Sequence, residues 1–176
     1  AYTPQDRTAG SWTPCTTATA AKFTAAGYFF AEMLNDVLSV PVGIIDCSWG
    51  GSRVESWMSR EVLSGYSDID LTEEGISRVA QHLRPMVMYN AMLRPVAGYT
   101  VRGFLWYQGE SNVGRYMDYA ARLADMVSLW RGLWAQDDLP FYYVEIAPFE
   151  YGNGKSPYLR EAQCRAQELI PNSGMI

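Results

Sequence analysis

Hydrophobic positions along the chain change between helical spacing and short continuous runs. Between Phe23 and Leu38 apolar side chains recur three and four positions apart and stop before Pro41, which predicts an amphipathic helix. The same spacing predicts a long helix over 119–134 and a last helix over 159–170. A helix with one apolar face must bury that face, so we expect these helices to pack on a sheet.

Short runs of β-branched and aromatic residues lie between these helices. The polar segment 60–82 predicts a loop with a short helix, and 86–92 predicts another helical turn. Strands joined by helices make right-handed crossovers, so the sequence predicts an α/β fold with a parallel sheet flanked by helices on both faces. The apolar runs predict three strands and the start of a fourth: 42–47, 101–107, 141–147 and 174–176.

Composition is that of a globular protein. The 176 residues are 48% hydrophobic and 19% charged, which excludes disorder and fits one domain or part of one. The net charge is -5 and Lys and Arg do not cluster, so no nucleic-acid partner is expected. No run of about 18 apolar residues exists, so no membrane partner is expected either. Residues 1–20 predict an irregular lead-in, and Ala1 is expected to follow a removed segment or a start within the gene.

Residue types that bind metals or form disulfides are few. Cys15, Cys47 and Cys164 are an odd number at irregular spacing, which fits neither a disulfide framework nor a Cys-x-x-Cys metal site. A bridge between Cys15 and Cys47 stays open as an alternative to three free thiols. His82 is the only histidine and the acidic residues lack calcium-loop spacing, so the sequence predicts no metal and no cofactor.

Loops after the predicted strands are the places to look for a site, because ligands bind at the carboxyl ends of the strands in parallel sheets. The loop 48–52 contains Gly50 and Gly51, whose backbone N–H groups can approach an anion closely; a tight turn is the alternative. The loop 147–154 is rich in glycine and aromatic residues and predicts either a sugar-stacking wall or an ordinary surface loop.

The loop 108–112 is the strongest functional signal. Gln108, Glu110 and Asn112 follow an apolar strand and bring two amide groups and a carboxylate to the mouth of the sheet. The alternative is structural: Glu110 caps a helix start or pairs with an arginine such as Arg53, and Asn112 acts as an N-cap.

Residues 106–112, Trp-Tyr-Gln-Gly-Glu-Ser-Asn, are the most specific of several stretches that point to one known family. The other stretches follow in the order of that family at 42–57, 88–95, 102–105, 130–131, 141–149 and 159–163. Together they resemble the sialate O-acetylesterases of the SGNH hydrolase superfamily. The resemblance implies a flavodoxin-like three-layer fold, incomplete in this chain. It also implies hydrolysis of O-acetyl esters on sugars by a serine nucleophile, a histidine base and an orienting acid, without a metal.

The resemblance also implies roles for single residues. Gly51, or the glycine before it, matches the glycine whose N–H helps to form the oxyanion hole. Gln108 and Asn112 are the side-chain amides nearest to the place of a further oxyanion donor, and the resemblance does not choose between them. Arg53 and Glu110 are the candidates for contacts to the substrate.

The chain departs from the family pattern in two blocks. The nucleophile block, glycine-glutamine-serine-asparagine-methionine, and the aspartate-x-x-histidine block do not occur in the sequence. We expect both to lie just outside the termini, so that residues 1–176 are the central part of one SGNH-type catalytic domain, completed by the remainder of the same polypeptide. The alternative is a complete site in this chain, with Ser52 or Ser111 as nucleophile and His82 as base.

Two interpretations of other classes compete with an esterase. A scaffold domain would present a large apolar cleft to separate chains. A non-catalytic carbohydrate-binding module would use exposed aromatic side chains, although packing is the commoner role of such residues. The esterase interpretation implies an O-acetylated sugar as partner, sialic acid or another, and a secreted, periplasmic or lysosomal location. The aromatic candidates of the binding module are Trp49, Trp57, Trp106, Tyr107 and Tyr151.

Overall fold

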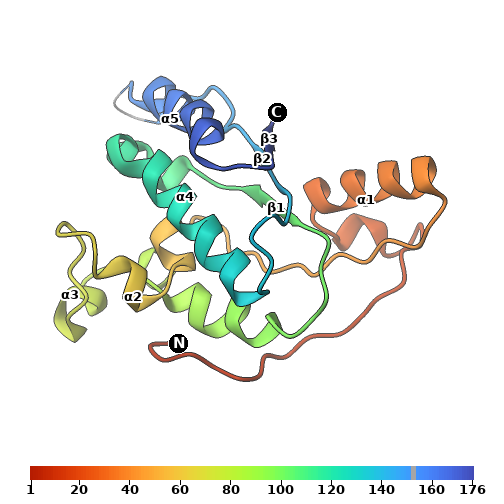
Figure 1. Ribbon diagram of the computed structural model, residues 1–176, viewed down its shortest axis with the longest axis horizontal. Coiled ribbons are helices and arrows are strands. Elements are labelled where there is room, and N and C mark those ends of the chain that lie inside the picture. The colour runs from red at the N-terminus through yellow and green to blue at the C-terminus, as the bar shows by residue number, and fades with distance from the viewer. Residues whose placement is uncertain (152–153) are drawn as a thin grey trace. The chain divides into compact units, whose positions relative to one another are not determined.

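The chain divides into two compact units, which Figure 1 traces in the computed structural model. The structure describes residues 1–151 and 154–176. The larger unit consists of Ala1–Thr8 and Trp49–Ile176, and the smaller unit is Ala9–Ser48. The predicted site residues from Gly51 onward therefore all belong to the larger unit.

A parallel sheet forms the centre of the larger unit. Its strands β1 (Phe104–Tyr107), β2 (Phe141–Val144) and β3 (Ser173–Met175) pair in the order β1-β2-β3. Helix α4 (Tyr116–Leu133) connects β1 to β2, and helix α5 (Ser156–Leu169) connects β2 to β3. Two right-handed crossovers in the same direction bring both helices to one face of the sheet, where α4 and α5 pack side by side (Figure 1). The predicted α/β class is confirmed.

An aromatic core lies between the sheet and α4. Side chains alternate along each strand, so Phe104 and Trp106 on β1 are buried on the same side as Phe141 on β2. The Trp130 ring of α4 contacts all three edge to face, with its centroid 5.4 Å from the Phe104 ring and 5.5 Å from the Trp106 ring. Packing is therefore the role of most tryptophans on these elements.

Strands β1 and β2 are shorter than the sequence predicts, for local reasons. Just before β1, the backbone at Gly103 passes very close to the Pro140 carbonyl oxygen, and a Cβ atom at Gly103 would lie 2.9 Å from that oxygen. The regular strand begins only after this position. After β2, the Ile146 N–H donates to the Gln163 side-chain oxygen at 3.0 Å instead of to a neighbouring strand. The predicted strand start at 174–176 is confirmed by β3.

Short helices fill the segment between the glycine loop and β1, as predicted for 60–82 and 86–92. Side chains cap two of them: Ser59 Oγ accepts from the Val62 N–H, and Thr72 Oγ1 accepts from the Gly75 N–H. These elements are η2 (Val54–Trp57), α2 (Arg60–Leu63), α3 (Glu73–Ser77), η3 (Gln81–Leu83), the π-helix η4 (Tyr89–Leu93) and η5 (Arg94–Val96), followed after β1 by η6 (Glu110–Arg115).

The smaller unit contains η1 (Ala20–Lys22) and helix α1 (Ala25–Leu38), which confirms the first predicted helix. Helix α1 ends at Ser39, whose left-handed conformation (φ 54°) turns the chain. The predicted strand over 42–47 is wrong, because a strand needs a neighbour for its backbone groups and the described Ala9–Ser48 unit contains no strand. Packing of α1 on a sheet stays a prediction.

No helix in the described part of the chain is both long enough and apolar enough to cross a membrane.

Candidate active site

Two loops meet at the carboxyl end of β1. One is the turn from β1 into η6, and the other is the glycine loop that leads into η2. Gly109 makes the first turn possible, because a Cβ atom there would lie 2.7 Å from Ile146 Cγ2 and 3.0 Å from Leu159 Cδ2. The turn after β1 therefore passes directly over the end of β2 and against α5.

Gln108 is held entirely by hydrogen bonds within the protein. Its side chain is buried, and Nε2 donates to the Ser52 carbonyl oxygen at 2.9 Å and to Asn112 Oδ1 at 2.7 Å. Its Oε1 accepts from the Tyr119 hydroxyl at 3.0 Å. Burial raises the pKa of Tyr119, so that hydroxyl stays protonated and can donate. Both amide protons of Gln108 thus have protein acceptors.

Asn112 has a different pattern of hydrogen bonds. It is 1% exposed, and its Oδ1 accepts from Gln108 Nε2 and from the Val54 N–H at 3.0 Å. Its Nδ2 donates to Glu55 Oε2 at 2.9 Å, and its second amide proton has no acceptor among residues 1–151 and 154–176. Asn112 therefore keeps one donor that Gln108 lacks. It does not serve as the side-chain cap of η6 that the structural alternative expected.

A buried ion pair holds the Asn112 amide in place. Glu55 receives the Asn112 hydrogen bond on one oxygen, and Arg122 and Arg115 bond its other oxygen. Arg122 is itself 1% exposed and also donates to both oxygens of Asp68, at 2.6 and 2.7 Å. Burial acts to lower the pKa of Arg122, but the hydrogen bonds and charges of Asp68 and Glu55 raise it overall, so the guanidinium stays charged. The sequence alone did not identify this network.

The glycine loop presents free backbone donors beside this network. Gly51 has a left-handed conformation (φ 75°), and the Ser111 hydroxyl donates to its carbonyl oxygen at 2.7 Å. Gly51 is exposed, and its N–H has no acceptor in the described ranges. The structure therefore brings Gly51 and Asn112 to the same edge of the sheet, although no strand precedes the glycine loop in the described residues.

His82 lies against this loop, which the sequence did not predict. A Cβ atom at Gly51 would lie 3.3 Å from His82 Cδ2. The weak periodicity of 60–82 gives no signal for this contact. The alternative of a complete serine–histidine site gains no support, because neither Ser52 nor Ser111 bonds to His82 in the described residues: Ser52 accepts from Trp57 Nε1, and Ser111 donates to Gly51.

Arg53 and Glu110 occupy different surroundings. Arg53 donates from Nε to the Ser111 carbonyl oxygen at 3.2 Å and lines a cavity of about 160 Å³. Burial and the neighbouring Arg115 charge lower the pKa of Arg53. Glu110 is exposed at the start of η6 and forms no ion pair with Arg53 in the described structure, so the predicted alternative pairing of these two is wrong.

The aromatic candidates divide into buried and exposed side chains. Trp57 and Trp106 belong to the core, with 2% and 8% of their surfaces exposed, so they cannot stack on a sugar. Trp49 and Tyr107 are about half exposed. Gly152 and Asn153 of the predicted aromatic loop lie outside the described residues.

The described structure contains neither a disulfide nor a cluster of metal-binding side chains. No disulfide joins any of Cys15, Cys47 and Cys164 in the described structure, so the alternative Cys15–Cys47 bridge is not formed. Burial raises the pKa of the Cys47 thiol to about 11, with a smaller contribution from Asp46. Within the described ranges no group of three or more His, Cys, Asp or Glu side chains is arranged to hold a metal ion.

Comparison with known proteins gives one consistent family. A family model described as carbohydrate esterase, sialic acid-specific acetylesterase matches residues 12–176. The chain is 27% identical to a sialate O-acetylesterase of Mus musculus, over 86% of this chain and 35% of the mouse protein. It is 32% identical to a sialate O-acetylesterase of Homo sapiens, over 61% of this chain and 21% of the human protein.

A solved structure agrees with these sequence matches. The crystal structure of a carbohydrate acetylesterase from Xanthomonas citri superposes with a TM-score of 0.87 and 33% sequence identity. The match covers 99% of this chain and 39% of that chain. The chain thus spans about a third of the length of the mouse and bacterial proteins.

Proposed function

Because the chain belongs to the sialic acid-specific carbohydrate acetylesterase family, we propose that it forms one wall of an active site that hydrolyses O-acetyl esters of sugars. The observation that carries the proposal is the unused amide proton of Asn112, which lies on the same sheet edge as the exposed N–H of Gly51. Hydrogen-bond donors of this kind stabilise a developing oxyanion. The proposed substrate is an O-acetylated sugar, with 9-O-acetyl sialic acid as the first candidate.

In this mechanism a serine hydroxyl attacks the acetyl carbonyl carbon, and the carbonyl oxygen becomes a tetrahedral oxyanion. Asn112 Nδ2 and the Gly51 N–H would donate to that oxygen. Gln108 is a positioning residue, since both of its amide protons already bond within the protein and one of them fixes Asn112. Donors of this kind contribute about 3–4 kcal/mol each to lowering the barrier.

The nucleophile and the base would come from other parts of the same polypeptide. Two facts support this part of the proposal: the family's serine and histidine blocks are absent from the 176 residues, and the chain spans about a third of the relatives' length. Residues 1–176 would then be the central part of one catalytic domain. Arg53 and Glu110 are the proposed contacts to the sugar, Arg53 through the cavity it lines and Glu110 through its exposed carboxylate.

The test is acetate release from 9-O-acetyl-N-acetylneuraminic acid, measured for the 176-residue chain and for a longer form extended at both ends in the natural reading frame. We expect release by the longer form only. Release by the short chain would overturn the divided site and direct attention to Ser52, Ser111 and His82. No release by either form would overturn the proposed activity.

A further inference from the structure

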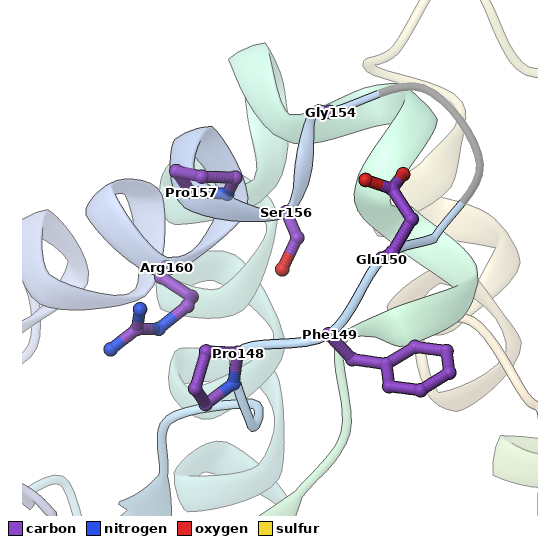
Figure 2. Close-up of a pocket in the computed structure, with 7 residues that line it drawn as sticks. All are labelled: Pro148, Phe149, Glu150, Gly154, Ser156, Pro157 and Arg160. Atoms are coloured by element: carbon purple, nitrogen blue, oxygen red, sulfur yellow. The ribbon is translucent and has the colours of Figure 1, made fainter.

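Two pockets of the larger unit each contain an arginine, and the two arginines differ in their partners. The pocket of Figure 2 lies between the loop after β2 and the first turn of α5, and its Arg160 donates to Glu145 Oε2 at 2.8 Å. The other pocket is the cavity of about 160 Å³ that Arg53 lines beside the proposed ester site. Arg53 forms no ion pair with a carboxylate of residues 1–151 and 154–176, so its charge is available to a ligand.

Hydrogen bonds hold Arg53 beside the proposed oxyanion donors. Its Nε donates to the Ser111 carbonyl oxygen at 3.2 Å, and the Ser111 hydroxyl donates to the Gly51 carbonyl oxygen at 2.7 Å. The next residue, Val54, donates its backbone N–H to Asn112 Oδ1 at 3.0 Å. A substrate whose acetyl group meets Asn112 and Gly51 can therefore place another of its groups against Arg53.

The Arg53 guanidinium has donors left for an anion. Of its nitrogens, only Nε has a hydrogen-bond acceptor in the described ranges, so both terminal nitrogens keep their N–H groups for a ligand. A planar guanidinium with these groups free matches the two oxygens of a carboxylate. Burial and the charge of Arg115 lower the pKa of Arg53, and a bound anion would stabilise the charged form.

Two of the carboxylates that line the cavity are already paired. Arg122 bonds to both Glu55 and Asp68. Arg115 lies beside the same two carboxylates, with its Nη1 3.3 Å from Glu55 Oε1 and 3.6 Å from Asp68 Oδ2. The positive and negative charges of this cluster balance, so an incoming carboxylate meets no net negative charge there.

The third carboxylate of the cavity, Asp70, is exposed to solvent. Its Oδ1 accepts from the Thr72 N–H at 2.9 Å and from the Thr72 hydroxyl at 2.6 Å. Solvent and salt weaken the repulsion between such a charge and an anion at Arg53. Apolar side chains such as Ile69 and Val79 complete the wall and suit the carbon atoms next to a carboxylate.

The volume of the cavity fits part of a sugar. Pockets that enclose a whole small molecule usually measure about 300–1,000 Å³, and this cavity measures about 160 Å³. A carboxylate and the carbon atom that bears it need only a small volume, and the rest of the sugar can extend toward Gly51 and Asn112. An O-acetylated acidic sugar carries both of the groups that this arrangement requires.

We propose that Arg53 binds the carboxylate of an O-acetylated acidic sugar and thereby selects acidic over neutral O-acetylated sugars. The selection among esters rests on the proposed function, whereas binding of the carboxylate does not. A sialic acid carries this carboxylate, and a neutral sugar such as O-acetylated xylose does not. Arg53 is thus a specificity-determining residue of the proposed ester site.

N-Acetylneuraminic acid is the probe for binding, compared with its C1 carboxamide, which has a similar shape and no charge. Each is titrated into the 176-residue chain and followed by NMR of the arginine Nε–H groups and backbone amides. The Arg53 signals should shift, and the Kd for the acid should be about tenfold lower than for the amide. Arg53→Ala should remove this difference. Equal Kd values for acid and amide in the wild type would overturn the proposal.

Arg60→Ala is the matched control for Arg53→Ala. Arg60 also donates to one backbone carbonyl oxygen, that of Leu71 at 3.0 Å, and forms no ion pair in the described part of the chain. It does not line the cavity. Arg60→Ala should therefore keep the tenfold difference between acid and amide. Loss of the difference in this variant too would overturn the assignment to Arg53.

Arg53→Lys separates a contact to the carboxylate from a structural role, and thermal unfolding checks that each variant is folded. Lysine keeps the charge but offers a single nitrogen, so the preference for the acid should fall to about threefold. A structural role would instead weaken the binding of acid and amide by the same factor. That result would overturn the inference.

Activity of the longer form tests the link to the ester site. For the wild type, kcat/KM for 9-O-acetyl-N-acetylneuraminic acid should exceed that for its C1 carboxamide about tenfold, mainly through KM, and Arg53→Ala should abolish the difference. Equal wild-type values for the two esters would overturn the selection of acidic sugars and leave the proposed function intact. If the acid binds at Arg53 but neither ester releases acetate, the proposed function fails and the carboxylate site stands.

Discussion

The ends of β1 and β2 lie side by side on one edge of the sheet, but the buried polar side chains at these two ends differ in their hydrogen bonding. After β1, Gln108 and Asn112 are buried and bond to each other and to Glu55. After β2, the Ser156 hydroxyl is buried as well, but it has no hydrogen-bond partner among residues 1–151 and 154–176. The first arrangement fixes the direction of a donor, and the second leaves a buried hydroxyl without a partner in the described structure.

This difference in hydrogen bonding should affect the stability of the fold. Groups that bond to one another stabilise the fold and lose that contribution when one of them is removed. A buried group without a partner destabilises the fold, so its removal should be harmless to stability. Substitutions of these side chains at the two strand ends should therefore have opposite effects on stability. The predictions below run from the largest expected effect to the smallest.

The largest effect should come from breaking the buried ion pair behind Asn112. Glu55→Ala removes the buried partner of Arg122 and leaves only partly exposed carboxylates such as Asp68 beside it, so we expect a loss of about 3–5 kcal/mol in the free energy of unfolding, measured with urea. Glu74→Ala is the matched control, because it breaks an exposed ion pair with Arg78 that is worth about 0–1 kcal/mol. Similar losses in both variants would show that the cluster after β1 does not stabilise the fold.

Asn112→Ala should lower kcat for acetate release by the longer form about 100-fold, or about 2.7 kcal/mol, because an oxyanion donor is lost. Gln108→Ala should have a smaller effect, since Gln108 acts only by orienting Asn112. An unchanged rate for Asn112→Ala would remove this residue from the active site. A larger loss for Gln108→Ala would exchange the two roles.

Packing between the two strand ends should be sensitive to a single methyl group. Gly109→Ala places a Cβ atom 2.7 Å from Ile146 Cγ2, and we expect a loss of about 1–3 kcal/mol from overpacking. Gly114→Ala is the control, because no atom lies within 4 Å of the added methyl group. Thermal unfolding of the two variants measures the difference. Equal Tm values would mean that the two strand ends are not tightly coupled.

The sequence predicted elements whose signal is local. The apolar spacing of 119–134 and 159–170 identified α4 and α5, and the apolar runs identified β1, β2 and the β3 end, because each pattern depends on residues close in the chain. The loop 108–112 was identified for the same reason, as a polar segment directly after an apolar strand. Family resemblance then singled out Gly51, Gln108 and Asn112.

Features that depend on contacts between residues far apart in the sequence could not be predicted from local patterns. The run 42–47 has strand composition, but no neighbouring strand exists in its described unit. His82 meets Gly51 across 31 positions of weakly patterned sequence. Which amide keeps a free proton depends on Ser52, Tyr119 and Glu55, and no local pattern reports those contacts.

The smallest effect should appear as a pH dependence of stability at Asp68, on the solvent side of the cluster after β1. Burial acts to raise the pKa of this carboxyl, but the hydrogen bonds and charge of Arg122 lower it below the ordinary 3.8. A carboxylate with a lowered folded-state pKa stabilises the fold above 3.8, and this contribution disappears as the pH falls through the folded-state pKa. Wild type should therefore exceed Asp68→Asn in Tm at about pH 6, with a gap that closes below 3.8. Because Asp68 is 46% exposed, that gap should be smaller than the loss for Glu55→Ala, and a gap that persists at low pH would show that the charge of Asp68 is not what stabilises the cluster.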